Sequence, residues 1–391
     1  MKIKVIHIIT KLELGGAQQN TIFTVSNLNR EIFQPILWTG PEGILTGEAA
    51  KKMGPDFKIV RSLEREINPK KDLAALFELR RMLKEEKKLS QGAAIIVHTH
   101  SSKAGILGRI AAWLAGIPVV VHSFHGFGFN EFQPLPVREA YIIAEKITGF
   151  LTDSFIFVSR ANMKKAGELG IGKPSQYNLI RSGIDILEFK PKAMDRKAKR
   201  RELGISEDGK LALMVACFKP QKNPLDFVAA AEIVLKNFPD AWFAIAGDGE
   251  LRPELEAAIA KAGLKDRFKL LGWRRDVPEL MWASDLLVLT SLWEGLPRVF
   301  PQAMSAGLAI VGTRVDGGPE AVVDDVNGWL LPPKDIEGIA GRMVELLKDD
   351  EKRARMGREG SEMVAEFDIH KMVRDQEQLY ERLLKEQNLW N

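Results

Sequence analysis

The chain has 391 residues, of which 45% are hydrophobic and 28% charged, a composition typical of a globular protein large enough for two domains. Its one cysteine, Cys217, excludes an internal disulfide, and this fits a reducing compartment, the cytoplasm. The longest apolar stretch, residues 105–121, is interrupted by Arg109 and Pro118 and is too short to cross a bilayer. No small-residue cleavage site follows the apolar N-terminus, so we expect no signal peptide.

The net charge of +4 is unevenly spread along the chain. Residues 1–185 hold 25 Lys and Arg against 17 Asp and Glu, a net +8, and the remaining residues carry a net −4. A basic first half predicts an anionic partner, which is either a phosphate-bearing substrate or an anionic membrane surface. We expect no nucleic acid partner, because no basic run carries the aromatic residues typical of single-strand binding.

Apolar runs alternate with helix-length segments along the whole chain. Strands are expected at residues 2–9, 35–39, 93–98, 119–122, 154–158 and 177–180, and then at 211–216, 241–246, 268–271, 286–290 and 309–312. Helices are expected between them, at residues 18–28, 72–87, 104–115, 137–150, 160–168, 226–237, 250–262, 277–283, 297–305 and 335–348. This alternation predicts an α/β protein with two doubly wound, Rossmann-like domains, whose strand carboxyl ends face each other across a cleft.

A change of composition marks the boundary between the two series. Residues 191–201 are strongly charged and are predicted to form a solvated helix, and we expect the hinge near residues 182–192. The first domain would span residues 1–185 and the second residues 186–370. A final helical segment, about residues 371–391, is expected to pack back on the first domain.

Three strand-to-helix junctions of the first domain carry residues suited to a ligand. Gly15 and Gly16 follow the first strand and let the backbone approach a phosphate, although a plain tight turn explains them equally well. Ser101 and Lys103 follow a later strand, and Lys103 is either a cation for an acceptor phosphate or a solvated residue. His125 lies in a glycine-rich loop from which it can face the cleft as a hydrogen-bond partner, the alternative being a histidine paired inside the core.

A metal site is considered and disfavoured. His98 and His100, two apart on a strand, can point the same way, but no H-E-x-x-H or paired Cys–His spacing accompanies them, so we expect no zinc. The chain also lacks a D-x-D sequence. A diphosphate would therefore be neutralised by Lys, Arg and helix N-termini rather than by a carboxylate-held Mg²⁺, and we expect no cofactor.

Loops after three strands of the second domain carry residues suited to a ligand. Lys219 and Lys222 follow the strand at 211–216 and would anchor a diphosphate leaving group. Gly247 follows the next strand, and a single glycine there is only weak evidence for a binding loop. Trp273 follows the third strand and could hold a nucleotide base. Together these loops form one rim that favours a ligand.

The most informative stretch is Glu294-Gly-Leu-Pro-Arg-Val-Phe-Pro-Gln302. It places a carboxylate at the carboxyl end of an apolar strand, where α/β folds bind ligands, and Gly295 lets the backbone turn there. The N–H groups of the following helix, near Leu296 to Arg298, favour an anion, so Glu294 would bind sugar hydroxyls beside phosphates. The simpler alternative is a strand-to-helix turn with a solvated glutamate.

The motifs, in order and spacing, resemble a retaining nucleotide-sugar glycosyltransferase of the GT-B architecture, glycosyltransferase family four (group 1). The resemblance runs nearly end to end. It is carried by Gly15-Gly16-Ala, His125-Gly126, Ser182-Gly-Ile-Asp185, Lys222-Asn, Gly247-Asp-Gly249, Leu271-Gly, Asp285, Glu294-Gly-Leu-Pro, Ala303-Met-Ser-Ala-Gly307 and Gly317-Gly-Pro-Glu320. Residues 97–105 and 124–127 are similar to those of enzymes that build bacterial surface polysaccharides or lipid-linked glycans.

The resemblance implies roles for individual residues. Gly16 would approach the donor diphosphate, and His125 would contact the transferred sugar. Lys222 would offset charge on the departing nucleoside diphosphate, Glu294 would bind donor sugar hydroxyls, and Gln302 would hold the ribose. Backbone N–H groups near 296–299 would meet the phosphates.

Two positions depart from the family pattern. The second carboxylate of its E-x7-E motif is Gln302 here, which offers one acceptor oxygen and no charge. The usual Gly-Arg pair before the phosphate lysine is Ala216-Cys217, so one cation is missing and Lys219 or Arg298 would have to substitute.

The sequence thus predicts a metal-independent, retaining transfer of a sugar, with a UDP-sugar favoured as donor, to a hydroxyl of a lipid-linked or polysaccharide acceptor. The enzyme would be cytoplasmic, and peripheral on the membrane if residues 127–150 lie at its surface. The alternatives are a nucleotide-sugar epimerase or a sugar phosphorylase of the same fold, a non-catalytic nucleotide-sugar-binding protein, and a dinucleotide oxidoreductase, which the absent G-x-G-x-x-G fingerprint disfavours.

Overall fold

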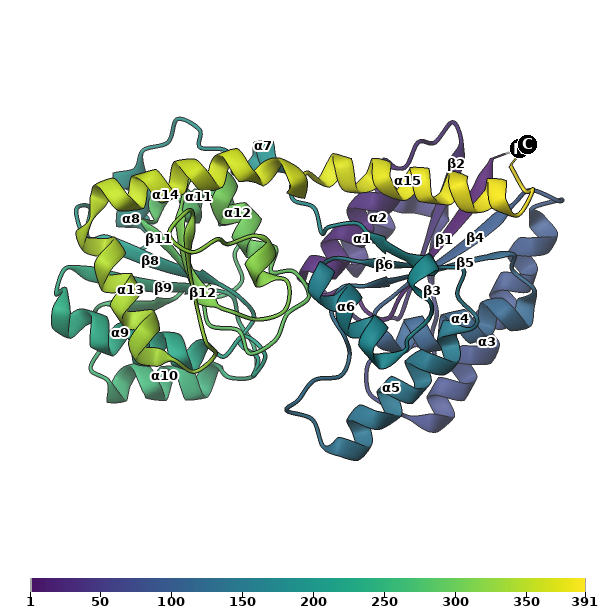
Figure 1. Ribbon diagram of the computed structural model, residues 1–391, viewed down its shortest axis with the longest axis horizontal. Helices are drawn as coiled ribbons and strands as arrows, with labels where there is room; N and C mark the ends of the chain where they lie inside the picture. Colours follow the sequence, from purple (N-terminus) through teal and green to yellow (C-terminus); the bar gives the residue numbers. More distant parts are fainter. Residues whose placement is uncertain (1, 391) are drawn as a thin grey trace. The chain divides into compact units, whose positions relative to one another are not determined.

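The computed structural model describes residues 2–390, which form two compact units (Figure 1). The first unit comprises Met1–Gly183 and Ile369–Asn391, and the second comprises Ile184–Asp368. Both units are α/β, and each is built on one fully parallel sheet.

The first unit has a seven-stranded sheet in the order β3-β2-β1-β4-β5-β6-β7. Its strands are β1 (Ile3–Ile9), β2 (Phe33–Thr39), β3 (Phe57–Ile59), β4 (Ile95–His100), β5 (Val119–Phe124), β6 (Ser154–Phe157) and β7 (Tyr177–Leu179). Its helices are α1 (Gly16–Asn27), α2 (Thr46–Met53), α3 (Pro69–Leu89), α4 (Ser102–Ala115), α5 (Leu135–Gly149), α6 (Arg160–Leu169) and α15 (Ile369–Glu386).

Successive side chains of β1 point to opposite faces of this sheet and pack in different core clusters. Ile6 and Ile8 pack in one core cluster with side chains of α3 and α4, whereas Val5 packs in another with α15. On the same side as Val5, α15 buries an amphipathic stripe that contains two polar residues, Gln376 and Tyr380. The C-terminal helix is therefore part of the first unit and lies along its sheet (Figure 1). It brings two polar side chains, Gln376 and Tyr380, into the core of that unit.

The second unit has a six-stranded sheet in the order β10-β9-β8-β11-β12-β13. Its strands are β8 (Lys210–Val215), β9 (Ala241–Ala246), β10 (Phe268–Leu270), β11 (Leu286–Leu289), β12 (Ala309–Thr313) and β13 (Gly328–Leu331). Its helices are α7 (Ile186–Phe189), α8 (Arg196–Glu202), α9 (Pro224–Asn237), α10 (Arg252–Lys261), α11 (Val277–Ala283), α12 (Val299–Ser305), α13 (Ile336–Lys348) and α14 (Asp350–Met363).

The charge run before β8 forms α8, which is mostly exposed, as its composition predicts, except that Arg200 is buried. Arg200 is only 4% exposed, and its guanidinium donates to Asp285 (2.6 Å) and to the carbonyl oxygens of Ala283 and Gly209. Asp285 also accepts from the backbone N–H of Leu211. A buried ion pair thus fixes α8 against the starts of β8 and β11, because a buried guanidinium must be fully hydrogen-bonded.

Each sheet reverses its strand order once, between β1 and β4 in the first unit and between β8 and β11 in the second. At such a reversal the loops after the two strands lead to opposite faces and leave a crevice at the carboxyl ends. The two reversals are therefore where ligand-binding residues are expected.

Candidate active site

Lys222 and Glu294 meet at the reversal of the second unit. Lys222 follows β8 and Glu294 follows β11, and the Lys222 ammonium donates to Oε1 of Glu294. The same oxygen accepts from the Ser291 hydroxyl at 2.7 Å. The Glu294 side chain is 6% exposed and that of Lys222 is 19% exposed, so the pair is shielded but within reach of a ligand.

Hydrogen bonds between loops hold this pair in place. The N–H of Leu292 donates to the Gln221 carbonyl at 2.8 Å, and the Gln221 amide donates to the Trp293 carbonyl at 3.0 Å. From the β12 side, Asp316 accepts from the N–H of Glu294 at 2.7 Å. We call the loops 217–223, 290–296 and 314–318 the charged rim. Three strands thus fix the position of one carboxylate.

The glutamine and arginine that follow Glu294 lie around the start of α12. Gln302 is partly buried one turn into the helix, and Leu296 is buried just before it. Burial lowers the pKa of Arg298 to about 10, although the nearby Glu188 carboxylate opposes this shift. Arg298 therefore stays positively charged at neutral pH, close to an acidic neighbour.

Cys217, at the position of the missing family arginine, brings no charge. Burial raises the pKa of its thiol, against the opposing effects of Lys222 and Lys219. At neutral pH the thiol is protonated, so the cations of this loop are the two lysines.

Gly247 follows β9 and Trp273 follows β10, so both lie at the carboxyl edge of the second unit's sheet. Gly247 has φ +148°, and a Cβ there would lie 1.9 Å from the Ala216 carbonyl oxygen, so only glycine lets this loop pass the β8 loop. Its N–H donates to Gly272 at 2.8 Å. Trp273 follows directly and is 47% exposed, which leaves its indole surface accessible to a ring.

The reversal of the first unit is built from hydroxyls and histidines. After β1 and β4, the hydroxyls of Thr10 and Ser101 lie 2.8 Å apart. His125, after β5, has its Nε2 3.0 Å from Nδ1 of His100. We call Thr10, Ser101, His100 and His125 the neutral rim.

Lys103 is not a solvated cation. Its ammonium donates to Asp72 at 2.6 Å and to the Glu66 carbonyl, and its side chain is 12% exposed. A phosphate at Lys103 would therefore have to displace a carboxylate.

Gly15 has extended backbone (φ −145°), which other residues also adopt, and precedes Gly16, the first residue of α1.

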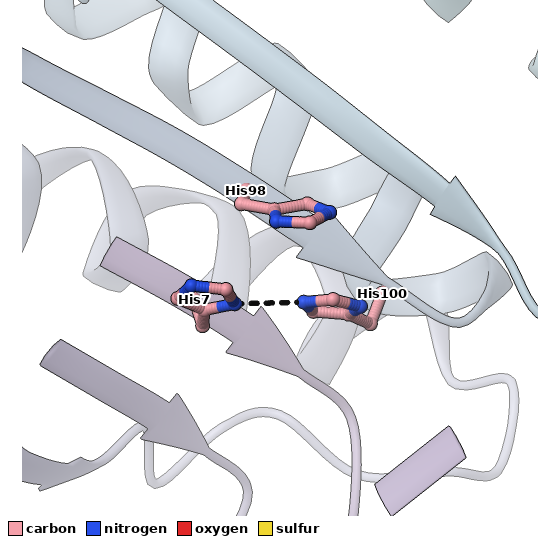
Figure 2. A group of neighbouring side chains, drawn as sticks. All are labelled: His7, His98 and His100. Carbon is pink, nitrogen blue, oxygen red and sulfur yellow. Dashed lines mark hydrogen bonds between the residues drawn. The ribbon is translucent and has the colours of Figure 1, made fainter. Parts of the chain in front are cut away.

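Behind His125 lies a buried cluster that the sequence signalled only through His98 and His100. The ring nitrogens of His7, His98 and His100 lie within 4.8 Å of one another (Figure 2). However, His98 bonds Tyr380 (2.6 Å) and Ser123 (2.7 Å), and His100 bonds His7 and His125. Each of these two rings uses both nitrogens, so a metal ion would have to break existing hydrogen bonds.

Burial also sets the charge of the cluster. It lowers the pKa of His7 to about 3, and it lowers the pKa values of His98 and His100 well below 6.5. All three imidazoles are neutral at pH 7.

The sequence did not indicate a role for Ser291, Asp316 or His7, because their roles depend on contacts between loops or strands distant in the chain.

The architecture and the site define a class, a GT-B protein with two doubly wound units. HepE of Anabaena, solved with UDP, superposes with a TM-score of 0.81 at 22% identity, covering 97% of this chain and 99% of that one. A glycosyltransferase of Rickettsia africae superposes with a TM-score of 0.79 at 18% identity, covering 98% and 99%. These likenesses confirm the predicted fold class.

Sequence relatives identify the family. Residues 195–363 match the Glycosyl transferases group 1 family, and residues 50–183 match the Glycosyl transferase 4-like domain. The chain is 34% identical over 382 residues, 97% of each protein, to UDP-Gal:alpha-D-GlcNAc-diphosphoundecaprenol alpha-1,3-galactosyltransferase of Escherichia coli. The chain therefore belongs to the group 1 glycosyltransferases of family four, and it is an enzyme that transfers a sugar from a nucleotide-sugar donor. The predicted family and enzyme class are confirmed.

Proposed function

We propose that the enzyme transfers a sugar from a UDP-sugar to a hydroxyl of a lipid-linked acceptor, with retention of configuration and without a metal ion. The Lys222–Glu294 pair at the β8/β11 reversal carries the proposal, because it offers a cation and a hydroxyl-binding carboxylate side by side. UDP is favoured because the Escherichia coli relative is named for UDP-Gal and HepE was solved with UDP. The lipid-linked acceptor is favoured by the diphosphoundecaprenol in that relative's name.

The charged rim would bind the donor by exchanging partners. The Lys222 ammonium would leave Glu294 for the diphosphate, and the freed carboxylate oxygen would accept from sugar hydroxyls. Lys219 and Arg298 would add positive charge near the leaving group. Trp273 would stack on the base, Gln302 would hold the ribose, and the N–H groups near Gly295 and Leu296 would meet phosphate oxygens. Gly247 would keep the neighbouring loop close.

Bond making and breaking would occur on one face of the sugar. The bond between the anomeric carbon and the diphosphate oxygen breaks as the acceptor oxygen bonds to the same carbon. The departing phosphate takes the acceptor proton, so no separate base is needed and configuration is retained. Lys222 then stabilises negative charge that grows on the leaving group, the step at which a fixed cation contributes most.

The first unit would supply the remaining contacts. His125 would hydrogen-bond the transferred sugar, Gly15 and Gly16 would let the α1 loop approach the diphosphate, and Ser101 and Lys103 would face the acceptor. An acceptor phosphate would compete with Asp72 for Lys103.

A peripheral position at the cytoplasmic face of the membrane would bring the enzyme to a lipid-linked acceptor. Within residues 2–390 no helix has the length and apolar composition needed to span a bilayer. Instead α5 and its flanks expose large apolar side chains, among them Leu135 (65%), Ile147 (59%) and Phe150 (85%). These side chains, together with the basic first half, support binding to an anionic surface.

A transfer assay tests the proposal. Purified enzyme would be given UDP-, GDP- and ADP-sugars and a polyprenyl-diphosphate-linked sugar, with and without EDTA, and the anomeric configuration of the product would be read by NMR. We expect a retained linkage from a UDP-sugar that is insensitive to EDTA. An inverted product, loss of transfer in EDTA, or conversion of the donor without an acceptor would each contradict the proposal.

A further inference from the structure

Three histidines form a continuous hydrogen-bonded chain that runs from the core of the first unit to the neutral rim. Nδ1 of His7 lies 3.0 Å from Nε2 of His100, and Nδ1 of His100 lies 3.0 Å from Nε2 of His125. Figure 2 shows His7 and His100 joined in this way, with the ring of His98 above them. His7 is on β1 and His100 on the adjacent strand β4, so two neighbouring strands of the rigid sheet support the His125 loop.

Burial keeps the inner part of this chain uncharged. The rings of His7 and His100 are buried, and burial lowers both of their pKa values. The rings of His98 and Tyr380 pack against His7, and His98 also packs against His100. Thr24, Gln376 and Arg181 line a pocket together with His100 and His125. Arg181 is a cation, so it disfavours a second positive charge there. His7 and His100 therefore carry one proton each, and each of the two hydrogen bonds has one donor and one acceptor.

The inner end of the chain determines the direction of both hydrogen bonds. Nε2 of His7 is buried and has no hydrogen-bond partner among residues 2–390. Nδ1 of His125, at the other end, is also buried, and one of the two ends must carry an N–H that no histidine of the chain accepts. His7 is fully buried in the core, whereas His125 lies in a loop at the rim and is only partly buried, so a ligand can accept its N–H. Because an orphaned N–H in the interior is costly, His7 keeps its proton on Nδ1 and donates to His100. His100 must then carry its proton on Nδ1 and donate to Nε2 of His125. It follows that His125 carries its own proton on Nδ1.

We propose that His100 and His7 are positioning residues that fix both the orientation and the tautomer of His125, making its Nδ1–H a hydrogen-bond donor to an oxygen of the substrate. This role rests on the proposed function, in which His125 contacts the transferred sugar. His125 is then a donor rather than a base, which agrees with a reaction whose leaving phosphate takes the acceptor proton.

Two substitutions of His100 separate its two hydrogen bonds. In H100N the side-chain amide stands near the position of Nδ1 and can still donate to His125, but the link to His7 is lost. In H100Q the amide stands near Nε2 and keeps the link to His7, but the link to His125 is lost. We expect kcat to fall about tenfold to hundredfold in H100Q, because a misplaced catalytic contact has effects of that order, and to fall less in H100N. The KM for the donor should change little in either variant.

His122→Phe is the matched control. His122 is also a buried histidine on an adjacent strand, β5, but its ring bonds Thr99 and packs against Gly105 and Phe124, and it is not one of the hydrogen-bonded chain from His7 to His125. The H122F variant should lose thermal stability without a change in kcat. If H100N, H100Q and H122F lower stability alike and leave kcat alike, the positioning role is overturned.

A spectroscopic measurement tests the tautomer independently of turnover. Two-bond ¹⁵N–¹H correlations on ¹⁵N-histidine-labelled enzyme should show His125 protonated on Nδ1 in the wild type and in H100N, and a mixture of tautomers in H100Q. Protonation of His125 on Nε2 in the wild type would overturn the proposal. Because no substrate is needed, this result stands even if no sugar is transferred, an outcome that would contradict only the proposed function.

Discussion

The two rims occupy the same place in two sheets of the same design but use opposite chemistry. In the second unit, the loops at the β8/β11 reversal carry a lysine–glutamate pair. In the first unit, the residues at the β1/β4 reversal are hydroxyls and imidazoles, and burial keeps the imidazole of His100 neutral. All six histidines of the chain lie in the first unit.

This difference shows what each rim is suited to. A diphosphate gains negative charge as it leaves, so cations beside it stabilise the transition state more than the ground state. A sugar ring carries no charge, and neutral donors in fixed positions bind it without the cost of burying an ion. The fold supplies equivalent positions in both units, and the residues at the strand ends make one rim ionic and the other neutral.

The largest expected effect comes from breaking the charged rim. Lys222→Ala should lower kcat by about 100- to 1000-fold, since one electrostatic contact to the developing charge is lost. It also leaves the Glu294 carboxylate buried without its cation, which should destabilise the protein by about 1–3 kcal/mol. Initial rates and thermal melts measure the two effects.

Adding Glu294→Gln to Lys222→Ala removes the orphaned charge, so the double variant should regain stability but not activity. Lys219→Ala is the matched control in the same loop and should cost less of both. A double variant no more stable than Lys222→Ala would mean that the pair contributes nothing to folding.

The next largest effect is a difference between the two units in how acid lowers their stability. His7, His98, His100 and His122 have pKa values lowered by burial, below the roughly 6.5 of an unfolded histidine. The neutral form is favoured in the folded state, so their stabilisation is complete above pH 6.5 and is lost as pH falls, for His7 down to about 3. Each contributes a slope of up to about 1.4 kcal/mol per pH unit.

The second unit has no histidine, and its perturbed carboxylates behave differently. Arg274 holds the pKa of Asp276 well below its usual range, so that contribution is lost only below about pH 4. Hydrogen exchange at pH 7 and pH 5.5 should show faster opening in the first unit alone. Equally faster hydrogen exchange in both units would contradict the assignment of the acid sensitivity to the buried histidines. His7→Phe should reduce the pH dependence of the first unit's stability.

A smaller effect is expected at the position that departs from the family pattern. Gln302→Glu would replace a neutral acceptor with a charged one, and such bonds are stronger by about 1 kcal/mol. The KM for the donor should fall about fivefold, whereas Gln302→Ala should raise it. Steady-state kinetics measure the KM for the donor in both variants. An unchanged KM in both would mean that Gln302 does not contact the nucleotide.

The smallest effect is expected at Lys103, because Asp72 already neutralises it. Lys103→Ala should change the KM for the acceptor by less than about threefold, the scale of a partly exposed ion pair. A tenfold rise would show that the acceptor displaces Asp72.

The sequence predicted the central strands well because each is a continuous apolar run. The expected strand 241–246 coincides with β9, and 286–290 with β11 apart from one residue. The edge strands β3 and β13 were missed, since they are short and partly exposed. The helix α14 was missed because it is almost entirely polar, and it is held by packing on α12 and α13 rather than by an apolar stripe.

The candidate site could be predicted only one loop at a time. Strand ends and glycines pointed to Lys222, Glu294 and His125. The sequence did not indicate that Lys222 and Glu294 bond each other, or that Asp72 neutralises Lys103, because these contacts depend on residues 72 and 31 positions apart. The chain from His7 to His125 was likewise invisible, since it needs the β1/β4 register.

The most direct test of the account is the thermal stabilisation of the enzyme by UDP, measured in the wild type and in Lys222→Ala. At one hundred times its dissociation constant UDP should stabilise the wild type by roughly 2.7 kcal/mol. We predict a clear rise in Tm for the wild type, a much smaller one for Lys222→Ala, and smaller shifts with GDP or ADP. Equal stabilisation of both proteins by UDP, or no shift with any nucleotide, would contradict a donor site built around Lys222.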